Sequence, residues 1–211
     1  MRIDSGETLS NRGTIDSQAG DILVIDGYWP RTKLAAEPLS AEAIELTQLR
    51  VWDDLASLLP GVAANDDLAI IEGTWGTDAP TVQTSDAKST SITQRLRFRR
   101  RLGAEYVSGG DIKLRIRAGM ITTISDDTAT VDVECYCDDE DGGVGADLCA
   151  TAAQSINSLT KADRDFVITA TGLAAGDVLD FRVTIAITDA ATATAVIGEI
   201  SRMVLLRDIR G

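Results

Sequence analysis

The residue types best suited to chemistry in this chain are its three cysteines. Cys135 and Cys137 are separated by one residue, and Cys149 follows further along the chain. Three thiolates suit zinc, but a structural zinc site takes about four ligands, and no histidine is present to supply another. Cys135 and Cys137 continue an alternation of apolar and polar residues, so they share one strand face with the valines before them. We therefore expect small core hydrophobes, with a disulfide to Cys149 as the alternative.

Acidic side chains form a second candidate site in the run Asp138-Asp139-Glu140-Asp141, which two glycines follow. Calcium favours oxygen-rich loops that contain a glycine for the turn. The spacing of EF-hand ligands is not met, because no glutamate stands where the bidentate ligand is required. We interpret residues 138–143 as an acidic hairpin tip, and calcium binding by this loop stays an open alternative.

Cationic side chains form a basic stripe within an acidic protein. Alternate positions of two predicted strands place the following residues on the solvent-facing side: Arg95, Arg97, Arg99, Lys113, Arg115 and Arg117. If the two strands pair, like charges face one another, which destabilises a sheet unless carboxylates neutralise them. Asp132 and Glu134 could supply these carboxylates in an internal ladder of ion pairs. Alternatively, the basic face contacts an acidic surface of a second subunit, which leads to self-association.

Composition narrows the classes of function. The chain of 211 residues has 33 acidic and 20 basic residues, a formal net charge of −13 and no histidine. This excludes Ser-His-Asp and Cys-His catalysis and histidine-based zinc hydrolysis, and no phosphate-binding loop or nucleophile elbow occurs. We expect a protein that is not an enzyme and that uses no cofactor and no metal. The negative charge also argues against nucleic acid or a membrane as partner.

Two further features concern the compartment. No apolar run approaches the roughly 18 residues of a membrane-spanning helix, and the first residues are polar, unlike a signal peptide. An odd number of cysteines fits a reducing compartment better than a disulfide framework. We expect synthesis in a cytoplasm and a soluble chain until it meets a partner.

The elements that position these side chains follow from a period-two pattern after residue 67. Apolar and polar residues alternate in segments 92–99, 111–120, 130–137 and 179–188, and shorter segments at 166–171 and 199–206 complete the set. Such alternation is typical of antiparallel strands with one buried face. Turn signals rich in glycine, serine and aspartate separate the segments. About seven or eight strands at this spacing predict an all-β, antiparallel, jelly-roll-like sandwich, with an open barrel as the alternative.

One segment has a helical pattern instead. Between residues 40 and 59, leucines and Trp52 recur at spacings of three and four. Ser40 is an acceptable N-cap, and Pro60-Gly61 ends the segment. We predict a short helix near 40–59, and the alternative is a strand at Gln48–Trp52 followed by a single helical turn.

The chain divides into residues 1–38 and 39–211. The first part contains one short apolar run and two prolines, and we predict an extended N-terminal arm. Tyr28 and Trp29 in this arm either dock on a neighbouring molecule or pack on the chain's own core. The second part is the predicted β-sandwich domain.

Three blocks of turns and strands stand out, at residues 65–80, residues 104–120 and residues 171–179. These blocks, within a similarity over roughly residues 50–211, resemble a group of uncharacterised structural proteins from virions of tailed bacteriophages and phage-like environmental genomes. The resemblance implies a virion structural protein, such as a capsid decoration, minor head or tail-associated subunit. Its partners would be itself, as a homo-oligomer, and other virion proteins, and its location the virion. The basic stripe, Tyr28 and Trp29 are then the candidate assembly contacts.

A different class of function stays open. β-Sandwiches often carry ligand sites on their loops, so the alternative is a carbohydrate- or receptor-binding module. Such a module requires an exposed aromatic platform. Trp75 and Tyr106 are the candidates for it.

Overall fold

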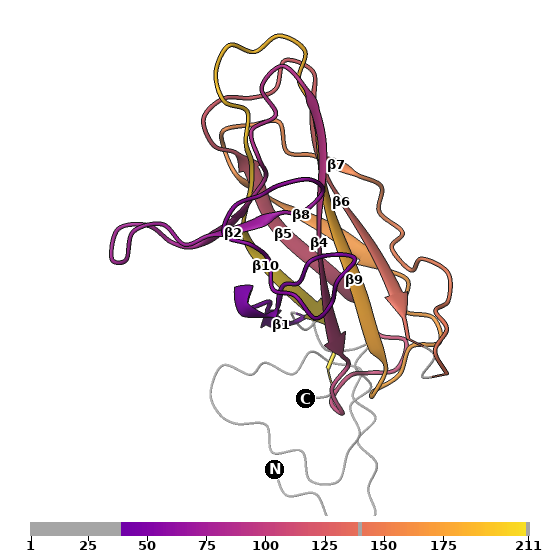
Figure 1. Cartoon of the computed structure of the whole chain (residues 1–211). Coiled ribbons are helices and arrows are strands. Elements are labelled where there is room, and N and C mark those ends of the chain that lie inside the picture. Colours follow the sequence, from indigo (N-terminus) through magenta and orange to yellow (C-terminus); the bar gives the residue numbers. More distant parts are fainter. Residues whose placement is uncertain (1–38, 139–140, 210–211) are drawn as a thin grey trace, which may run out of the picture. The chain divides into compact units, whose positions relative to one another are not determined.

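The computed structural model describes residues 39–138 and 141–209. The predicted N-terminal arm, with Tyr28 and Trp29, lies outside the described residues. Two antiparallel sheets make up the described part (Figure 1). Sheet A contains β1 (Ser40–Ala43), β2 (Ala69–Ile71), β3 (Thr81–Gln83), β5 (Ile112–Met120), β8 (Ala162–Ile168) and β10 (Gly198–Arg207). Sheet B contains β4 (Ser91–Arg101), β6 (Thr128–Cys137), β7 (Gln154–Ser155) and β9 (Val178–Thr188).

The order of the strands is that of a jelly roll. Sheet A runs β2-β3-β10-β5-β8, with β1 also on β10, and sheet B runs β4-β9-β6-β7. The first four strands after β2 each pair with one of the last four, as β3 with β10, β4 with β9, β5 with β8 and β6 with β7. Successive pairs alternate between the sheets, which is the winding of a jelly roll. The prediction of an all-β, jelly-roll-like sandwich is confirmed.

The core lies between the sheets and is built from the predicted alternation. The inward-facing apolar residues of β4, β5, β6, β8, β9 and β10 form most of this core. At the centre of sheet B, Phe98 and Phe181 face each other across β4 and β9, with ring centroids 4.9 Å apart. Such an aromatic pair contributes about 0.5–1.5 kcal/mol beyond the area that it buries.

The predicted helix near residues 40–59 is wrong. Residues Ser40–Ala43 form β1 on the edge of β10, and only Leu46–Gln48 make a short 3-10 helix, η2. The edge of β10 supplies backbone partners, and this pairing overrides a weak helical propensity. The leucine spacing has another cause, because Leu49 and Leu59 reach the core from an irregular segment whose Leu58 stays exposed. The alternative strand at Gln48–Trp52 is reduced to isolated bridges at Arg50, which pairs with Leu58 and with Arg97.

The irregular segment nevertheless has a defined position, because it is attached to the free edge of β4. Arg50 N–H donates to the carbonyl of Arg97 at 2.8 Å, and Arg97 N–H donates back at 3.0 Å. Further along, Arg95 N–H donates to the carbonyl of Asp66 at 2.7 Å. These long-range bonds fix the residues around Trp52 and Asp66 beside the outer face of sheet B. Within the described residues, no helix has the length and apolar character that crossing a membrane would need.

Candidate functional site

The outer face of sheet B carries a tryptophan from the irregular segment. The half-buried Trp52 ring lies over the guanidinium groups of Arg95 and Arg182, which are 5.1 and 5.5 Å from the ring centroid. Its indole N–H donates to Asp66 Oδ2 at 2.8 Å. Two cation–π contacts and one hydrogen bond therefore hold the orientation of the ring.

The residues beneath Trp52 are guanidinium–carboxylate pairs that connect neighbouring strands. Arg97 donates from Nε to Asp180 Oδ1 at 2.8 Å and from its terminal nitrogen to Oδ2 at 2.5 Å. The hydrogen bond to Asp180 raises the pKa of Arg97 above its ordinary value. Arg182, two residues beyond Asp180 on β9, forms a second ion pair with Glu134 of β6. Charge-assisted hydrogen bonds of this kind are strong, and they also fix the orientation of the side chains.

These side chains surround a shallow space of about 240 Å³, here called the Trp52 hollow. It is lined by Trp52, Arg97, Tyr136, Val144, Asp180 and Arg182. The hydroxyl of Tyr136 donates to Glu134 Oε1 at 3.3 Å, and desolvation together with the nearby carboxylate of Glu134 raises the pKa of this tyrosine. The hollow thus offers aromatic surface together with several donors and acceptors in fixed positions.

The predicted basic stripe does not form one face. β4 carries Arg95, Arg97 and Arg99 in sheet B, whereas β5 carries Lys113, Arg115 and Arg117 in sheet A. The two strands do not pair, because after β4 the chain crosses to the other sheet. The prediction of six cations on one sheet face is therefore wrong.

The arginines of the stripe are bound within the chain, as the alternative of an internal ladder predicts. In sheet B, Arg95 pairs with Asp66, Arg97 with Asp180, and Arg99 with Asp138 and Asp180. The carboxylates thus differ from the expected ones, since Glu134 pairs with Arg182 instead.

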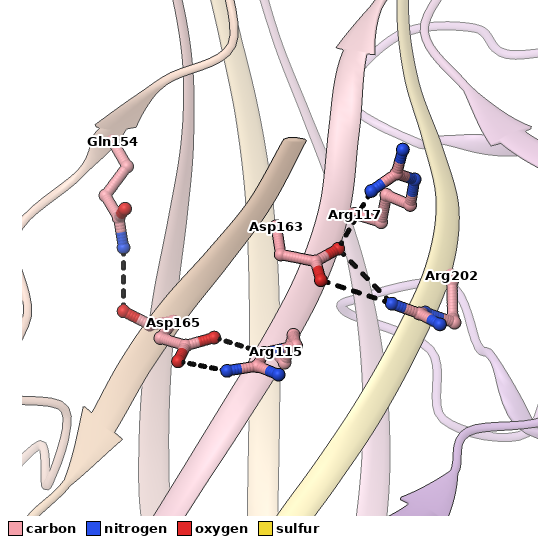
Figure 2. A network of polar contacts seen from close by, with 6 residues as sticks. All are labelled: Arg115, Arg117, Gln154, Asp163, Asp165 and Arg202. Atoms are coloured by element: carbon pink, nitrogen blue, oxygen red, sulfur yellow. Dashed lines mark hydrogen bonds and ion pairs between the residues drawn. The ribbon is translucent and has the colours of Figure 1, made fainter. Parts of the chain in front are cut away.

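The outer face of sheet A has a similar network but no aromatic ring. Figure 2 shows Arg115 bound by two bonds to Asp165, and Asp163 shared by Arg117 and Arg202. The hydrogen bond from Arg115 lowers the pKa of Asp165, and the charge of Lys113 adds to the effect. The outward positions of β5 and β8 are charged or aliphatic. The aromatic hollow is thus a feature that distinguishes the face of sheet B.

The two residues predicted as a ligand platform have opposite environments. Trp75 is fully exposed on the loop between β2 and β3. Tyr106 is fully buried, and its hydroxyl donates to the carbonyl of Gly110 at 2.7 Å. Burial raises the pKa of Tyr106. Tyr106 is therefore a core residue that anchors a turn, and its assignment to an exposed platform is wrong.

Of the residues that line the Trp52 hollow, only Arg97 is a candidate from the sequence, and there as an assembly contact. The helical spacing of the leucines includes Trp52, and nothing local shows that its segment attaches to β4. A signal for Tyr136 existed, because it alternates with Cys135 and Cys137 and so belongs to the solvent face of β6. Asp180 and Arg182 have the same kind of signal on β9, but their meeting with Arg97 depends on strand order.

The described residues of the cysteine cluster and of the acidic loop show no second chemical site. Cys135 is buried in the core, Cys137 and Cys149 are half-buried, and no disulfide joins these three described residues. Burial raises the pKa of the Cys135 thiol. In the part of the chain that the structure describes, no group of three or more potential ligands is arranged to hold a metal ion. Asp139 and Glu140 of the acidic loop lie outside that part, so calcium binding there stays a hypothesis.

Comparison with known proteins gives distant structural likenesses only. No family model and no curated protein matches the chain. A solved structure described as "Family 16 Carbohydrate Binding Module-2" has a TM-score of 0.41 at 9% identity, over 70% of this chain and 89% of that one. The CBM22-1 xylan-binding domain from Paenibacillus barcinonensis Xyn10C has a TM-score of 0.41 at 7% identity, over 84% and 100%. The xylan-binding module CBM15 has a TM-score of 0.40 at 13% identity, over 82% and 99%. Likenesses this distant say nothing about the ligand of this chain.

Proposed function

We propose that this chain is a carbohydrate-binding β-sandwich module that holds a neutral glycan chain on the outer face of sheet B, at the Trp52 hollow. The observation that carries the proposal is the combination of an oriented aromatic ring with guanidinium–carboxylate pairs in one shallow space. No catalytic group is needed for this function, because the module only binds.

The chemistry of a sugar ring matches these groups. A pair of neighbouring hydroxyls offers both donors and acceptors, and Arg97 with Asp180 offers the complementary set in one plane. The C–H face of the ring is apolar and stacks on aromatic surface such as Trp52 or Tyr136. Both features are required together, because hydrogen bonds alone compete poorly with water.

Charge balance indicates which glycans bind. Arg95, Arg97, Arg99 and Arg182 are each paired with a carboxylate. A negatively charged sugar would have to compete with these carboxylates for the arginines, within a chain of net charge −13. A neutral sugar leaves the ion pairs intact and uses their remaining lone pairs and N–H groups. We therefore expect neutral glycans to bind in preference to polyuronates.

The fixed side chains and the small volume of the Trp52 hollow also favour binding of a glycan chain. The side chains are held by ion pairs and cation–π contacts, so binding orders few additional rotamers. The volume of about 240 Å³ is below the roughly 300–1,000 Å³ of pockets that enclose drug-sized ligands. An open site of this size suits one sugar residue of a longer chain that continues across the sheet.

Affinity gel electrophoresis tests the proposal. The protein should be retarded by a soluble neutral polysaccharide, either xylan or mixed-linkage β-glucan, and not by polygalacturonate. Trp52→Ala should weaken the retardation at least about tenfold, the order expected for loss of a central aromatic contact. Trp75→Ala is the matched control and should bind as the wild type does, provided that circular dichroism shows both variants folded. No retardation by either neutral polysaccharide, or equal losses for both variants, would contradict the proposal.

The virion role implied by the sequence resemblance stays a prediction. The comparisons give it no support, and the arginines expected at assembly contacts are bound to carboxylates of the same chain. Static light scattering at low and high salt checks it. A virion subunit held partly by charge should form an oligomer that loosens with salt, whereas a constant monomer favours a binding module.

A further inference from the structure

A second surface lies apart from the Trp52 hollow, beside the loop that joins β2 to β3. This loop extends away from the sheets in Figure 1. A groove of about 720 Å³, here called the Trp75 groove, lies between this loop and residues 46–61. It is lined by Leu46, Thr47, Leu58, Leu59, Pro60, Gly61, Ile70, Glu72, Gly73, Trp75, Gly76, Asp78 and Pro80.

A hydrogen-bonded turn in this loop keeps the side chain of Trp75 exposed to solvent. Thr74 N–H donates to Asp78 Oδ2 at 3.0 Å, and Asp78 N–H donates to the carbonyl of Thr74 at 2.9 Å. Gly73 has φ +69°, and a Cβ there would lie 2.5 Å from the Cβ of Asp78. The turn therefore requires glycine at this position. The turn thus places a fully exposed tryptophan at the rim of the groove.

The groove is apolar beyond the tryptophan. Leu58 is 58% exposed, and it lines the groove together with the apolar residues Leu46 and Ile70. Exposed apolar side chains that gather around a groove mark an interaction surface rather than ordinary scatter. A tryptophan beside an apolar groove has the character of an interface centre, in which a few aromatic anchors contribute most of the binding energy.

The charge of the residues that line the Trp75 groove indicates which kind of partner binds there. The lining contains two carboxylates, Glu72 and Asp78, and no lysine or arginine. A second copy of this chain would bring the same carboxylates together and adds a net charge of −13, which opposes self-pairing. A partner with basic residues beside apolar ones is attracted instead, and its cations can also stack on the exposed indole of Trp75.

The hydrogen bonding of the β2 backbone indicates which contacts can hold the partner. On the outer side of β2, Ile70 N–H already donates to the carbonyl of Pro60 at 2.9 Å. Addition of a strand to this edge is therefore obstructed. Side-chain contacts in the groove, rather than main-chain pairing, provide the affinity.

We propose that the Trp75 groove docks an amphipathic, basic segment of another protein, with its apolar side chains against Leu58 and Trp75 and its cations at Glu72. This site is separate from the glycan site and does not depend on it. The two activities have different tryptophans, so each can fail without the other.

Fluorescence anisotropy with a labelled peptide of alternating leucine and lysine tests the docking, and the same peptide with glutamate for lysine is the charge control. The basic peptide should bind the full chain and the acidic one should not. Trp75→Ala and Leu58→Ala should each weaken binding about tenfold or more, and Glu72→Gln should weaken it several-fold and reduce the salt dependence. Leu159→Ala is the matched control, because Leu159 is 57% exposed outside the groove, and it should have no effect.

Three outcomes would overturn the proposal. One is binding of the basic peptide that is equal in wild type and Trp75→Ala, which indicates general attraction to an acidic protein. A second is a dimer in light scattering that Trp75→Ala abolishes, which makes the groove an interface between copies. The third is loss of polysaccharide retardation in Trp75→Ala with Trp52→Ala unaffected, which makes Trp75 the sugar platform.

Discussion

Arg97 of β4 and Asp180 of β9 form a bidentate pair across the outer face of sheet B, with nitrogen–oxygen distances of 2.8 and 2.5 Å. The two residues are diagonal neighbours in the register, since Arg97 lies opposite Arg182 and Asp180 opposite Arg99. Asp180 therefore also approaches Arg99, at 3.7 Å. Its carboxylate connects two arginines and forms one wall of the Trp52 hollow.

Replacing Asp180 should cost stability as well as ligand binding. Asp180→Asn removes the charge of a carboxylate that is only 12% exposed and that Arg97 and Arg99 share, and we expect a loss of about 2 kcal/mol in the free energy of unfolding. Urea denaturation measures this loss. Asp163→Asn on sheet A is the control, because its arginines are more exposed, and it should cost less than about 1 kcal/mol. Equal costs would show that the sheet B pair is an ordinary surface pair.

The acid sensitivity of the fold should depend on Asp189. Its carboxylate accepts hydrogen bonds from the amides of Ser89, Asp126 and Thr192 and from the Thr192 hydroxyl. Desolvation raises the pKa, but these bonds outweigh it and lower the pKa of Asp189 from 3.8 to about 2. Because the folded state binds the proton less tightly, the stabilisation is complete above pH 3.8 and is lost as the pH falls toward about 2.

Urea denaturation of wild type and Asp189→Asn at several pH values checks this prediction. The variant should be less stable at pH 7, where the wild-type carboxylate is charged. The difference between the two proteins should shrink as the pH falls below 3.8. A difference that stays constant across this range would show that the hydrogen bonds do not depend on the charge of Asp189.

Removal of the buried tyrosine hydroxyl should destabilise the fold without changing its shape. Tyr106→Phe keeps the ring in the core but leaves the carbonyl of Gly110 without this donor, so we expect a loss of about 1–2 kcal/mol. Tyr136→Phe is the matched control, because its bond to Glu134 is longer, at 3.3 Å, and lies at the surface. Thermal unfolding followed by circular dichroism distinguishes them. A Tyr106→Phe protein as stable as Tyr136→Phe would contradict an anchoring role.

The fold could be predicted from sequence where the signal was local. In β4, β5, β6 and β9 the period of two identifies the buried face directly, so core residues such as Phe98 and Phe181 follow from the pattern. β7 was missed because it is only Gln154–Ser155, too short for any period. The helix near 40–59 was predicted wrongly because leucines at helical spacing also arise in a segment that reaches the core at Leu49 and Leu59.

The candidate site depends on relationships that no local pattern contains. The hollow needs Arg50 on the edge of β4, β9 between β4 and β6, and β5 in the other sheet. Each of these is a long-range pairing set by how the sandwich closes. Outward-facing Tyr136 and Arg182 could be identified from alternation, but not that Trp52 covers them. The sequence also did not distinguish the exposed Trp75 from the buried Tyr106, because both were candidates for an exposed platform.

A titration followed by the indole N–H signals in a nitrogen–proton correlation spectrum tests the central claim most directly. A soluble neutral oligosaccharide is added to the full chain, and Trp52→Phe and Trp75→Phe assign the signals. We expect a saturable shift of the signal from the Trp52 indole N–H, the group that donates to Asp66. The side-chain signals of Arg97 and Arg182 should shift with it, while the Trp75 signal stays in place. A shift of the Trp75 signal alone, or no shift of the Trp52 signal at saturating sugar, would contradict glycan binding at the Trp52 hollow.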